Sequence, residues 1–514
     1  MTRAPHPLEL LVSIAAPARS TRSSTPMCSM HSFPPSPPWR PMRLSSWRRA
    51  ASLCAVVTTV ATAQGKPPAP HALGSVEATA TELLGAVSTA RALPGGRVLV
   101  NDVIGRRVLL FEKGLGSFTV VADTTPATGN AYAGRFGGLI AYRGDSTLFV
   151  DPQSLSMMVI DPSGKIGRVI SVPRPNDAQA LVAGNGGIPA FDGAGRLVYR
   201  AAPNFRFGGA GRPGGGAEGG RVRVEANPAT GDRPAMMLPD FPDSSAIVRV
   251  ELATRKLDTV TFVKVPRMRL TSTTDTSGRT MMTSVINPLP QVDDWAVLSD
   301  GSIAVVRGLD YHVDWFTPDG GKSSTAKLPF EWRPLNDSSK AVFLDSTKVA
   351  MEKLRAAAAA QMAANPGQPP RMPGGDAGAM PPMIVFRMQG GPPGGGGGGD
   401  SPRPRDQASG PSMNFSMPPL TFVEPNELPD YVPPFTTGAA RADMDGNLWV
   451  RTSIVQNGGP IYDVVDAKGA LIDRVALPAG RVIAGFGAGG VVYMGVREEK
   501  GVRLEQARRV VSQP

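Results

Sequence analysis

The chain has 514 residues, 54 of them basic and 43 acidic, for a formal net charge of +11. Its 59 glycines and 51 prolines gather in a few segments, a pattern that excludes chain-wide disorder and predicts a folded body with linkers and insertions. The length exceeds that of a usual single domain, but a fold that adds small sheets around an axis can reach it.

The amino terminus has the pattern of an export signal. After Met42 come three arginines, a short apolar run over residues 53–60 and the small-residue site that ends at Ala63. This order predicts a secretory signal peptide, with residues 1–63 removed by cleavage after Ala63 and Met42 as the true start. Lipoprotein processing at Cys54 and a twin-arginine signal at residues 48–49 fit less well, and the rival interpretation is an uncleaved membrane anchor. We therefore expect an exported protein, periplasmic or extracellular, with no membrane span after cleavage.

Removal of residues 1–63 changes the charge and cysteine arguments. That segment holds seven arginines and one glutamate, which leaves 47 basic and 42 acidic residues and a net charge of +5. Such a value is ordinary for a soluble protein, and we expect no nucleic-acid partner. Both cysteines, Cys28 and Cys54, lie in the removed part, so the mature chain is predicted to hold neither a disulfide nor a thiolate metal site.

A short pattern repeats through the rest of the chain. A turn with Gly or Asp is followed by alternating apolar residues, a gap, a second apolar run and another turn, over residues 94–114, 143–164, 192–200, 299–320, 443–469 and 487–510. Period-2 alternation bounded by Gly, Asp and Pro predicts half-buried antiparallel strands, and the DG and GG dipeptides suit tight hairpins. The first three turn centres, Gly96, Asp145 and Gly195, are roughly fifty residues apart, which is the length of one four-stranded propeller blade.

Six turn centres predict an all-β, six-bladed β-propeller over residues 74–511. A strand near residues 72–88 is expected to join the last blade and close the ring, which removes exposed sheet edges. Residues 64–73 are expected to form a flexible start.

Two insertions interrupt this pattern. The Gly-rich segment 203–243 is expected to be a mobile loop within the third blade. Segment 331–430 begins with a predicted helix over residues 337–365, capped by Asp337 or Ser338 and ended by Pro366, and continues as low-complexity, disordered sequence. The helix is expected to turn one apolar stripe toward the propeller, made of Val342, Leu344, Val349 and Leu354.

The segments GGRVLVNDVIGRRVLLFE and DGNLWVRTSIVQNGGPIYDVVDAKG resemble strands of NHL-type six-bladed propellers, and of the wider group with TolB-like and gluconolactonase-like proteins. The resemblance covers residues 74–511 without the two insertions. It implies a fold and no particular activity.

No catalytic constellation emerges from these residues. The gluconolactonase-like group binds a divalent metal through Glu, Asn and Asp, but the amino-terminal glutamate of that group has no matching context here. The mature chain has two histidines, His71 and His312, too few for a His-based metal site. Asp443-x-Asp445-Gly446-Asn447 resembles the start of a calcium loop, but lacks the distal Glu and is interpreted as a hairpin turn. The run of glycines at 394–399 lacks the Lys-Ser/Thr of a phosphate loop. We expect no catalytic residue, metal or cofactor, with calcium as the alternative.

Polar residues end the second strand of several repeats. Alignment of the repeats on their turns, with one extra residue allowed at Arg307, puts five of them in one column: Asn101, Asp151, Arg200, Arg307 and Arg451. A propeller would ring such positions around one face of its channel, where convergent arginines could bind an anion. Asp310 and His312 belong to the same hypothetical ligand-binding set, although a strand histidine with a satisfied hydrogen bond is the simpler interpretation. The competing view of the column is that its charges are solvated or paired with Asp151 and Asp102.

The sequence favours a non-catalytic function. We expect a monomeric exported platform that binds a protein, a peptide or a small anionic ligand on its channel face. The alternative is a metal-dependent, lactonase-like hydrolase, and a third possibility is a structural partner of an envelope complex that docks through the Ala-rich helix. Four tryptophans, at positions 295, 315, 332 and 449, are predicted to be blade core and not a sugar-stacking platform.

Overall fold

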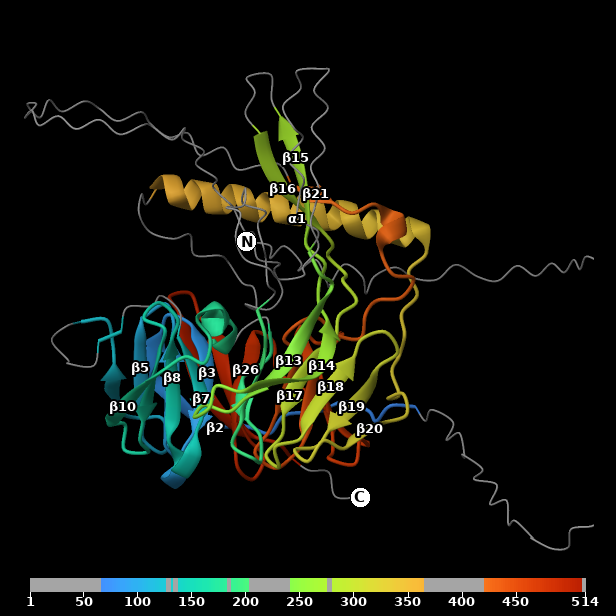
Figure 1. The fold of residues 1–514 in the computed structure, drawn as a ribbon. Coiled ribbons are helices and arrows are strands. Elements are labelled where there is room, and N and C mark those ends of the chain that lie inside the picture. Colours follow the sequence, from blue (N-terminus) through green and yellow to red (C-terminus); the bar gives the residue numbers. More distant parts are fainter. Residues whose placement is uncertain are drawn as a thin grey trace, which may run out of the picture. The chain divides into compact units, whose positions relative to one another are not determined.

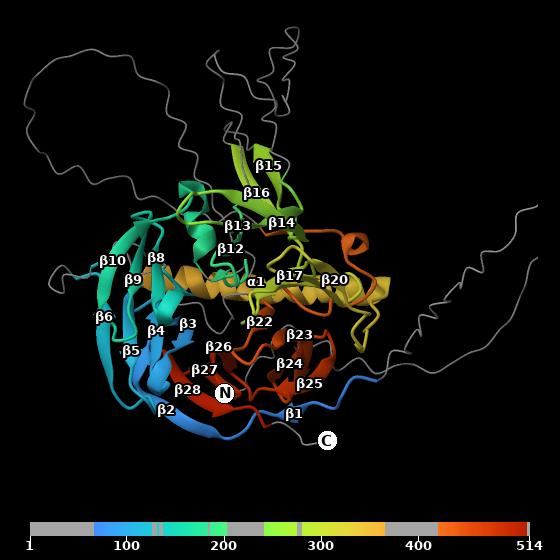
Figure 2. The same cartoon turned by 60° about the horizontal axis from the view of Figure 1, so that its bottom comes forward.

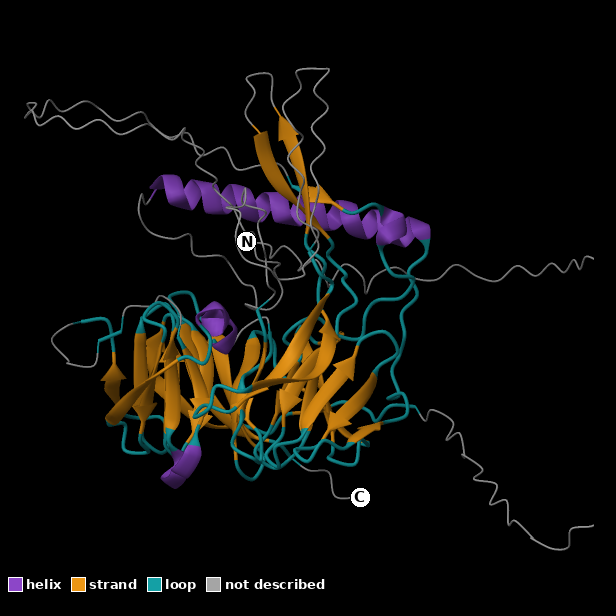
Figure 3. Cartoon of the chain, in the orientation of Figure 1, coloured by secondary structure: helices purple, strands orange, loops and turns teal. Residues whose placement is uncertain are grey.

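The computed structural model describes residues 66–125, 131–132, 137–182, 186–202, 241–274, 280–364 and 420–510. Two compact units divide the chain, Met1–Gly65 and Lys66–Pro514, and everything described lies in the second. The described part is almost entirely β-structure, with one long helix and a few 3-10 turns (Figures 1 and 3). The expected signal peptide and the low-complexity segment fall outside the described residues.

The first three repeats form three antiparallel sheets, each with its strands in sequence order. One contains β3 (Val87–Ala92), β4 (Val98–Asp102), β5 (Arg107–Phe111) and β6 (Phe118–Ala122). The next contains β7 (Gly138–Ala141), β8 (Thr147–Asp151), β9 (Ser156–Ile160) and β10 (Ile166–Ser171). The third contains β11 (Ala190–Phe191), β12 (Leu197–Arg200), β13 (Ser244–Val250) and β14 (Leu257–Lys264).

The remaining repeats form three further sheets. One contains β17 (Asp294–Val297), β18 (Ile303–Arg307), β19 (His312–Phe316) and β20 (Lys322–Ser324). The next contains β22 (Ala440–Ala442), β23 (Leu448–Gln456), β24 (Gly459–Val465) and β25 (Leu471–Ala476), with β1 (His71–Ala72) added in parallel to β25. The last contains β26 (Arg481–Gly487), β27 (Val491–Arg497) and β28 (Val502–Arg508), with β2 (Val76–Leu84) added antiparallel to β28.

The amino-terminal segment completes the last sheet, because β2 pairs with β28. The expectation of a flexible start over 64–73 differs from the structure at its carboxyl end. His71 and Ala72 pair with Val475 and Ala476, and His71 Nε2 lies 2.7 Å from an Asp473 carboxylate oxygen. A two-residue strand surrounded by Pro and Gly shows no sequence period, so its partner on β25 decides it.

Each predicted turn centre connects the first and second strands of a sheet. Gly301, for example, lies in the β17–β18 turn with φ +82, and a Cβ there would lie 1.9 Å from the backbone nitrogen of Gly193 in the β11–β12 turn. Glycine is therefore required at this turn both by its conformation and by the neighbouring sheet.

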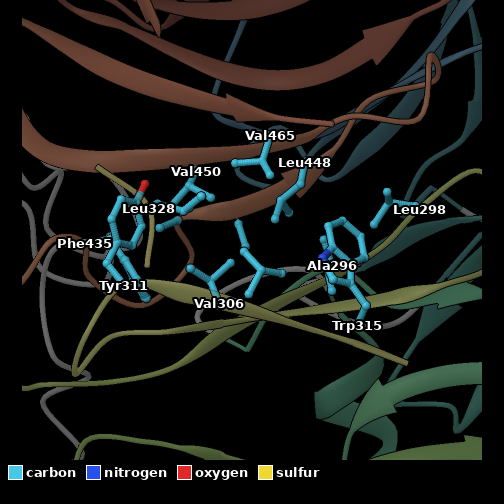
Figure 4. Packing of buried hydrophobic residues seen from close by; sticks show 14 of the residues in the cluster. Ala296, Leu298, Val306, Tyr311, Trp315, Leu328, Phe435, Leu448, Val450 and Val465 are labelled. Atoms are coloured by element: carbon cyan, nitrogen blue, oxygen red, sulfur yellow. The ribbon is translucent and has the colours of Figure 1, made fainter. Parts of the chain in front are cut away.

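Six clusters of buried apolar side chains lie among the described residues, and each joins two successive sheets. Figure 4 shows the cluster between the β17–β20 and β22–β25 sheets, where Val306 and Trp315 face Leu448 and Val450. Another cluster joins the last sheet to the first, since Ala484 and Tyr493 pack with Val98 and Leu109. Small antiparallel sheets packed face to face in this manner are a β-propeller.

The first strand of each sheet is the innermost. β26 contacts β3, β3 contacts β7, β7 contacts β11, and β17 contacts β22, while outer strands such as β10 are largely exposed. In Figure 2, β3, β22 and β26 lie toward the middle, and β2, β6 and β10 at the periphery. Central strands such as β4 and β8 are buried on both faces, because each sheet is covered by its two neighbours.

Strand alternation gives every sheet two ends. The turns between first and second strands lie at one end, which we call the turn end. The connections β12–β13, β14–β17 and β20–β22 all leave from the other, which we call the insertion end. The Gly-rich segment is the β12–β13 connection within the third sheet, and its residues 203–240 are outside the described part.

Two further elements belong to the insertion end. β15 (Arg269–Thr274), β16 (Thr280–Ile286) and β21 (Thr421–Phe422) form a three-stranded sheet that the sequence analysis does not predict. Helix α1 (Asp337–Ala364) confirms the helix expected over 337–365. Short 3-10 turns complete the described elements: η2 (Pro94–Gly96), η4 (Arg143–Asp145), η5 (Pro175–Leu181) and η6 (Pro425–Glu427).

The details of α1 differ from the sequence prediction. The cap is Asn336, whose Oδ1 accepts the Ser339 N–H at 2.8 Å, one residue earlier than expected. Val342 and Val349 are 54% and 49% exposed, so they do not belong to the buried stripe. The buried face follows the helical period through Lys340, Phe343, Leu344, Thr347 and Ala358. No described helix is both long enough and apolar enough to cross a membrane.

Candidate functional site

The five polar residues of the predicted column do not share one orientation. Asn101, Arg200 and Arg451 come two residues after Leu99, Val198 and Trp449, which pack against the following sheet. Asp151 and Arg307 come two residues after Phe149 and Val305, which pack against the preceding sheet. Side chains alternate along a strand, so an offset of one residue in the alignment reverses the face. The column is therefore split between the two faces of the sheets.

The Arg307 guanidinium is bound by two aspartates and one backbone carbonyl of the protein itself. Its Nε donates to Asp314 Oδ2 at 2.9 Å, and its Nη1 donates to Asp293 Oδ2 at 2.8 Å and to the Phe262 carbonyl at 2.9 Å. These partners tie the β17–β20 sheet to β14 of the preceding sheet. The pairing is of the kind that the competing view of the column describes, although the acids are different ones.

The Asp310 carboxylate and the His312 imidazole lie next to each other, close to the Arg307–Asp314 ion pair. His312 Nδ1 lies 2.6 Å from Asp310 Oδ1, and its Nε2 lies 3.4 Å from Asp314 Oδ1. Asp314 also holds Arg307, and Lys327 lies 3.8 Å from Asp310. Both ring nitrogens of His312 thus have a carboxylate neighbour, which fits a histidine with a satisfied hydrogen bond.

Asn101 and Asp151 act on the backbone and on nearby hydroxyls. Asn101 is fully buried and donates to the Ser88 hydroxyl and the Gly137 carbonyl, which precedes β7 of the following sheet. The Asp151 carboxylate accepts the Gln153 N–H at 3.1 Å and the Ser154 hydroxyl at 2.8 Å, and so shapes the β8–β9 turn. These contacts give both residues a role in joining strand ends.

Arg200 differs from the rest of the set. It is the last residue of β12 at the insertion end, and its side chain is half-buried. Within the described part of the chain its guanidinium makes no hydrogen bond and no ion pair. A Cβ at Gly186 would lie 3.0 Å from Arg200 Nη2, so the glycine leaves room for the planar group. Burial lowers the pKa of Arg200, which nevertheless stays a cation.

Asp294 is the acid whose charge acts on Arg200. It begins the innermost strand β17 and is 2% exposed. Its Oδ1 accepts the Trp295 N–H at 3.0 Å, and its Oδ2 accepts the Ala440 N–H of β22 at 2.8 Å. Burial raises the pKa of Asp294 to about 6, against the opposing effects of these two N–H groups and of Arg200. The pKa of this carboxyl group is therefore higher than that of an exposed aspartate.

Trp295 completes the local structure. Its indole Nε1 donates to the Gly186 carbonyl at 2.7 Å, and a Cβ at Gly187 would lie 2.5 Å from the same nitrogen. The loop before β11 is thereby held against β17 beside the Arg200 guanidinium. We call Arg200, Asp294, Trp295 and Gly186 the Arg200 site.

Arg200 can be predicted from the sequence, whereas its neighbours cannot. Asp294 stands between Asp293 and Trp295 at the start of an apolar run, which is the one signal of a buried acid. Gly186 and Gly187 look like ordinary loop glycines. Their proximity to Arg200 depends on the packing of two sheets and has no local signal.

Three of the four tryptophans are blade core, as the sequence predicts, whereas Trp332 is partly buried in the connection between β20 and α1. Trp295 and Trp449 are 1% exposed and Trp315 is 7% exposed, and Trp332 packs against the cluster of Figure 4. The Asp443 turn is likewise a hairpin turn. Its carboxylate accepts the N–H groups of Asp445 and Asn447 and the indole N–H of Trp449, with the last at 2.8 Å.

Metal ligation requires several donor side chains that converge on one point. Within the described ranges no three His, Cys, Asp or Glu side chains gather as metal ligands.

Comparisons with known proteins extend to the fold. No family model matches the chain, and no curated protein matches it either. Among solved structures, virginiamycin B lyase from Staphylococcus aureus is similar at 9% identity, with a TM-score of 0.34 and 85% of this chain and 99% of that chain covered. A gluconolactonase from Xanthomonas campestris is similar at 11% identity, with a TM-score of 0.31 and 86% and 99% coverage.

A third similar structure is regucalcin from Agrobacterium tumefaciens, described as a calcium-binding protein. It is 10% identical, with a TM-score of 0.33 and coverage of 86% of this chain and 97% of that one. At these TM-scores and identities the likeness carries no argument about the fold or the chemistry of this chain.

Proposed function

We propose that this protein is an exported binding protein, a six-bladed propeller that holds an anionic group of a peptide or small molecule at its insertion end. Six sheets of four or five strands and six inter-sheet clusters, the last returning to the first sheet, support one closed ring of six blades. Export after cleavage behind Ala63 and a monomeric state are parts of the same proposal. Amino-terminal sequencing of the secreted protein and size-exclusion chromatography test these two parts.

The observation that carries the binding proposal is the guanidinium of Arg200, which has no partner within the described residues. The charge of Asp294 acts on this half-buried cation without a hydrogen bond or a close ion pair, so part of the solvation that the guanidinium loses on burial is not replaced. A carboxylate on a ligand would accept two parallel N–H bonds from the planar group and restore that loss. Gly186 leaves the space beside Nη2 free of a side chain.

Asp294 controls the net charge beside such a ligand, and Trp295 holds the loop next to it in place. Asp294 is close enough to lower the net positive charge when ionised, and with a pKa of about 6 it is partly protonated in mildly acidic solution. We therefore expect an anion to bind more tightly below pH 6 than above it, because the competing negative charge is then neutralised. Trp295 holds the loop wall and contributes no charge.

The test uses the full-length chain and three probe anions: acetate, gluconate and glucuronate. A thermal-shift titration is expected to show saturable stabilisation by at least one probe, lost in Arg200→Gln. The matched control is Lys500→Gln, which removes an equal charge from an exposed turn and should keep the wild-type shift. Equal shifts in the wild type and Arg200→Gln, or no shift with any probe, would end the proposal.

The alternative is a lactonase-like hydrolase. One observation favours it, since a buried carboxyl group with a pKa raised to about 6 is suited to acid–base catalysis. Elemental analysis of the purified mature protein distinguishes the two functions. Stoichiometric calcium or zinc would favour the metal-dependent hydrolase, and hydrolysis of glucono-lactone lost in Asp294→Asn would favour a metal-free one.

A further inference from the structure

A basic groove lies at the turn end, between the β7–β10 and β11–β14 sheets. It has a volume of about 560 Å³, within the usual size range of small-molecule sites. The lining combines four arginines, Arg143, Arg168, Arg196 and Arg255, with one acid, Glu251. Arg196 precedes β12 and Arg200 ends it, so the groove and the Arg200 site lie at opposite ends of one strand.

Two of the arginines are fixed by the protein itself. Arg255 donates from Nη1 to the Val172 carbonyl at 2.6 Å and from Nη2 to the Ser171 hydroxyl at 2.6 Å. Arg196 is paired with Asp192 at 2.8 Å and also donates to the Pro318 carbonyl. These contacts join neighbouring sheets and give the groove rigid walls.

The other two present free donors. Arg168 donates from Nη2 to the Tyr142 hydroxyl at 3.2 Å and is otherwise exposed. The Arg143 guanidinium has neither a hydrogen bond nor an ion pair in the described structure, and its Nη2 would lie 3.1 Å from a Cβ on Gly195. Arg143 therefore extends across the groove from the β7–β8 turn to the β11–β12 turn.

The charge balance of the groove is positive. Arg143, Arg168 and Arg255 have no ion pair within the described residues, whereas Glu251 is the one acid of the lining, and its carboxylate accepts the Thr254 hydroxyl at 2.7 Å. Apolar parts of Ile170 and Leu252 also line the space. Such a lining suits a compact organic anion with more than one negative group and a short carbon skeleton.

We propose that this groove is a second ligand site, which binds a small polyanion that carries carboxylate or phosphate groups. Arg143 and Arg168 supply the free N–H donors, and Arg255 supplies fixed positive charge. The site is independent of the Arg200 site, since it shares no residue with it.

Isothermal titration of the full-length chain at low ionic strength tests the proposal, with citrate as the carboxylate probe and inorganic pyrophosphate as the phosphate probe. At least one probe is expected to bind with a stoichiometry of one, and Arg143→Ala to weaken that binding about tenfold, as for loss of a charge-assisted hydrogen bond. Binding of citrate alone identifies carboxylates, and binding of pyrophosphate alone identifies phosphates.

Two further variants keep the test specific. Ala194→Glu places a negative charge on an exposed position of the lining and should abolish binding without loss of any packing. Arg97→Ala removes the same charge as Arg143→Ala from the corresponding turn of the β3–β6 sheet and should leave binding unchanged. Absence of binding by both probes, or equal weakening by Arg97→Ala, would overturn the proposal. Arg200→Gln is expected to leave this binding intact, so the two sites fail separately.

Discussion

Tyr311 provides a sharp test of how the sheets are joined. It is fully buried between the β17–β20 and β22–β25 sheets, and its hydroxyl donates to Asp463 Oδ2 at 2.7 Å. Asp463 is also fully buried, and its Oδ1 accepts Arg474 Nε at 3.0 Å. Tyr311→Phe keeps the ring and its packing but leaves one oxygen of a buried carboxylate without its donor.

The expected loss of unfolding free energy is about 2 kcal/mol, the usual value for a hydrogen bond to a charged group. Urea unfolding followed by tryptophan fluorescence measures it from the shift of the midpoint at unchanged slope. Tyr493→Phe is the matched control, because Tyr493 is 3% exposed and its hydroxyl has no hydrogen-bond partner in the described residues. We expect that control to lose less than about 0.5 kcal/mol. Equal losses in the two variants would refute the role given to the Tyr311–Asp463 bond.

Two other predictions concern the contact between β26 and β3 and the Arg200 site. Gly485→Ala would place a Cβ 1.8 Å from the Ala90 carbonyl oxygen, so β26 and β3 must separate, and we expect a loss of about 1–3 kcal/mol in urea unfolding. Gly116→Ala, where no atom lies within 4 Å of the new Cβ, should change the stability by less than about 0.5 kcal/mol, and equal effects would contradict the close approach of the two strands. Because the pKa of Asp294 is raised in the folded state, the wild type should lose up to about 3 kcal/mol of stability as the pH rises from about 4 to about 7. Asp294→Asn should lose less over the same range in parallel urea titrations, and identical pH profiles would contradict the raised pKa.

The strands and turns can be predicted because their signals are local. Apolar alternation beside turns that contain Gly or Asp is sufficient to find the first–second turns, as at Gly301, where a left-handed conformation requires glycine. Helix α1 is also a local feature, with an Ala-rich sequence followed by a proline. Its cap and part of its buried face are predicted wrongly, since Asn336 is the cap and Val342 and Val349 are exposed. Which face of a helix is buried depends on what packs against it.

The candidate site depends on longer-range information. Arg307 and Arg200 occupy similar places in the aligned repeats, but one extra residue turns Arg307 toward Asp293 and Asp314, whereas Arg200 has no partner in the described structure. Local sequence does not predict which acidic side chain will form an ion pair with which arginine. Asp294 acts on Arg200 across a sheet interface, from a distant position in the chain.

The amino-acid sequence by itself determined that this protein is built of short antiparallel strands, where they turn, and that Trp295, Trp315 and Trp449 are core residues. These properties follow from side-chain alternation and turn conformation, which act over a few residues. The tertiary structure decided the register in which the amino-terminal strand β2 pairs with the last sheet, the surroundings of Arg200 and the meeting of four arginines at the turn end. Each of these depends on which faces of neighbouring sheets are brought together, and a one-residue change in register is sufficient to alter the outcome.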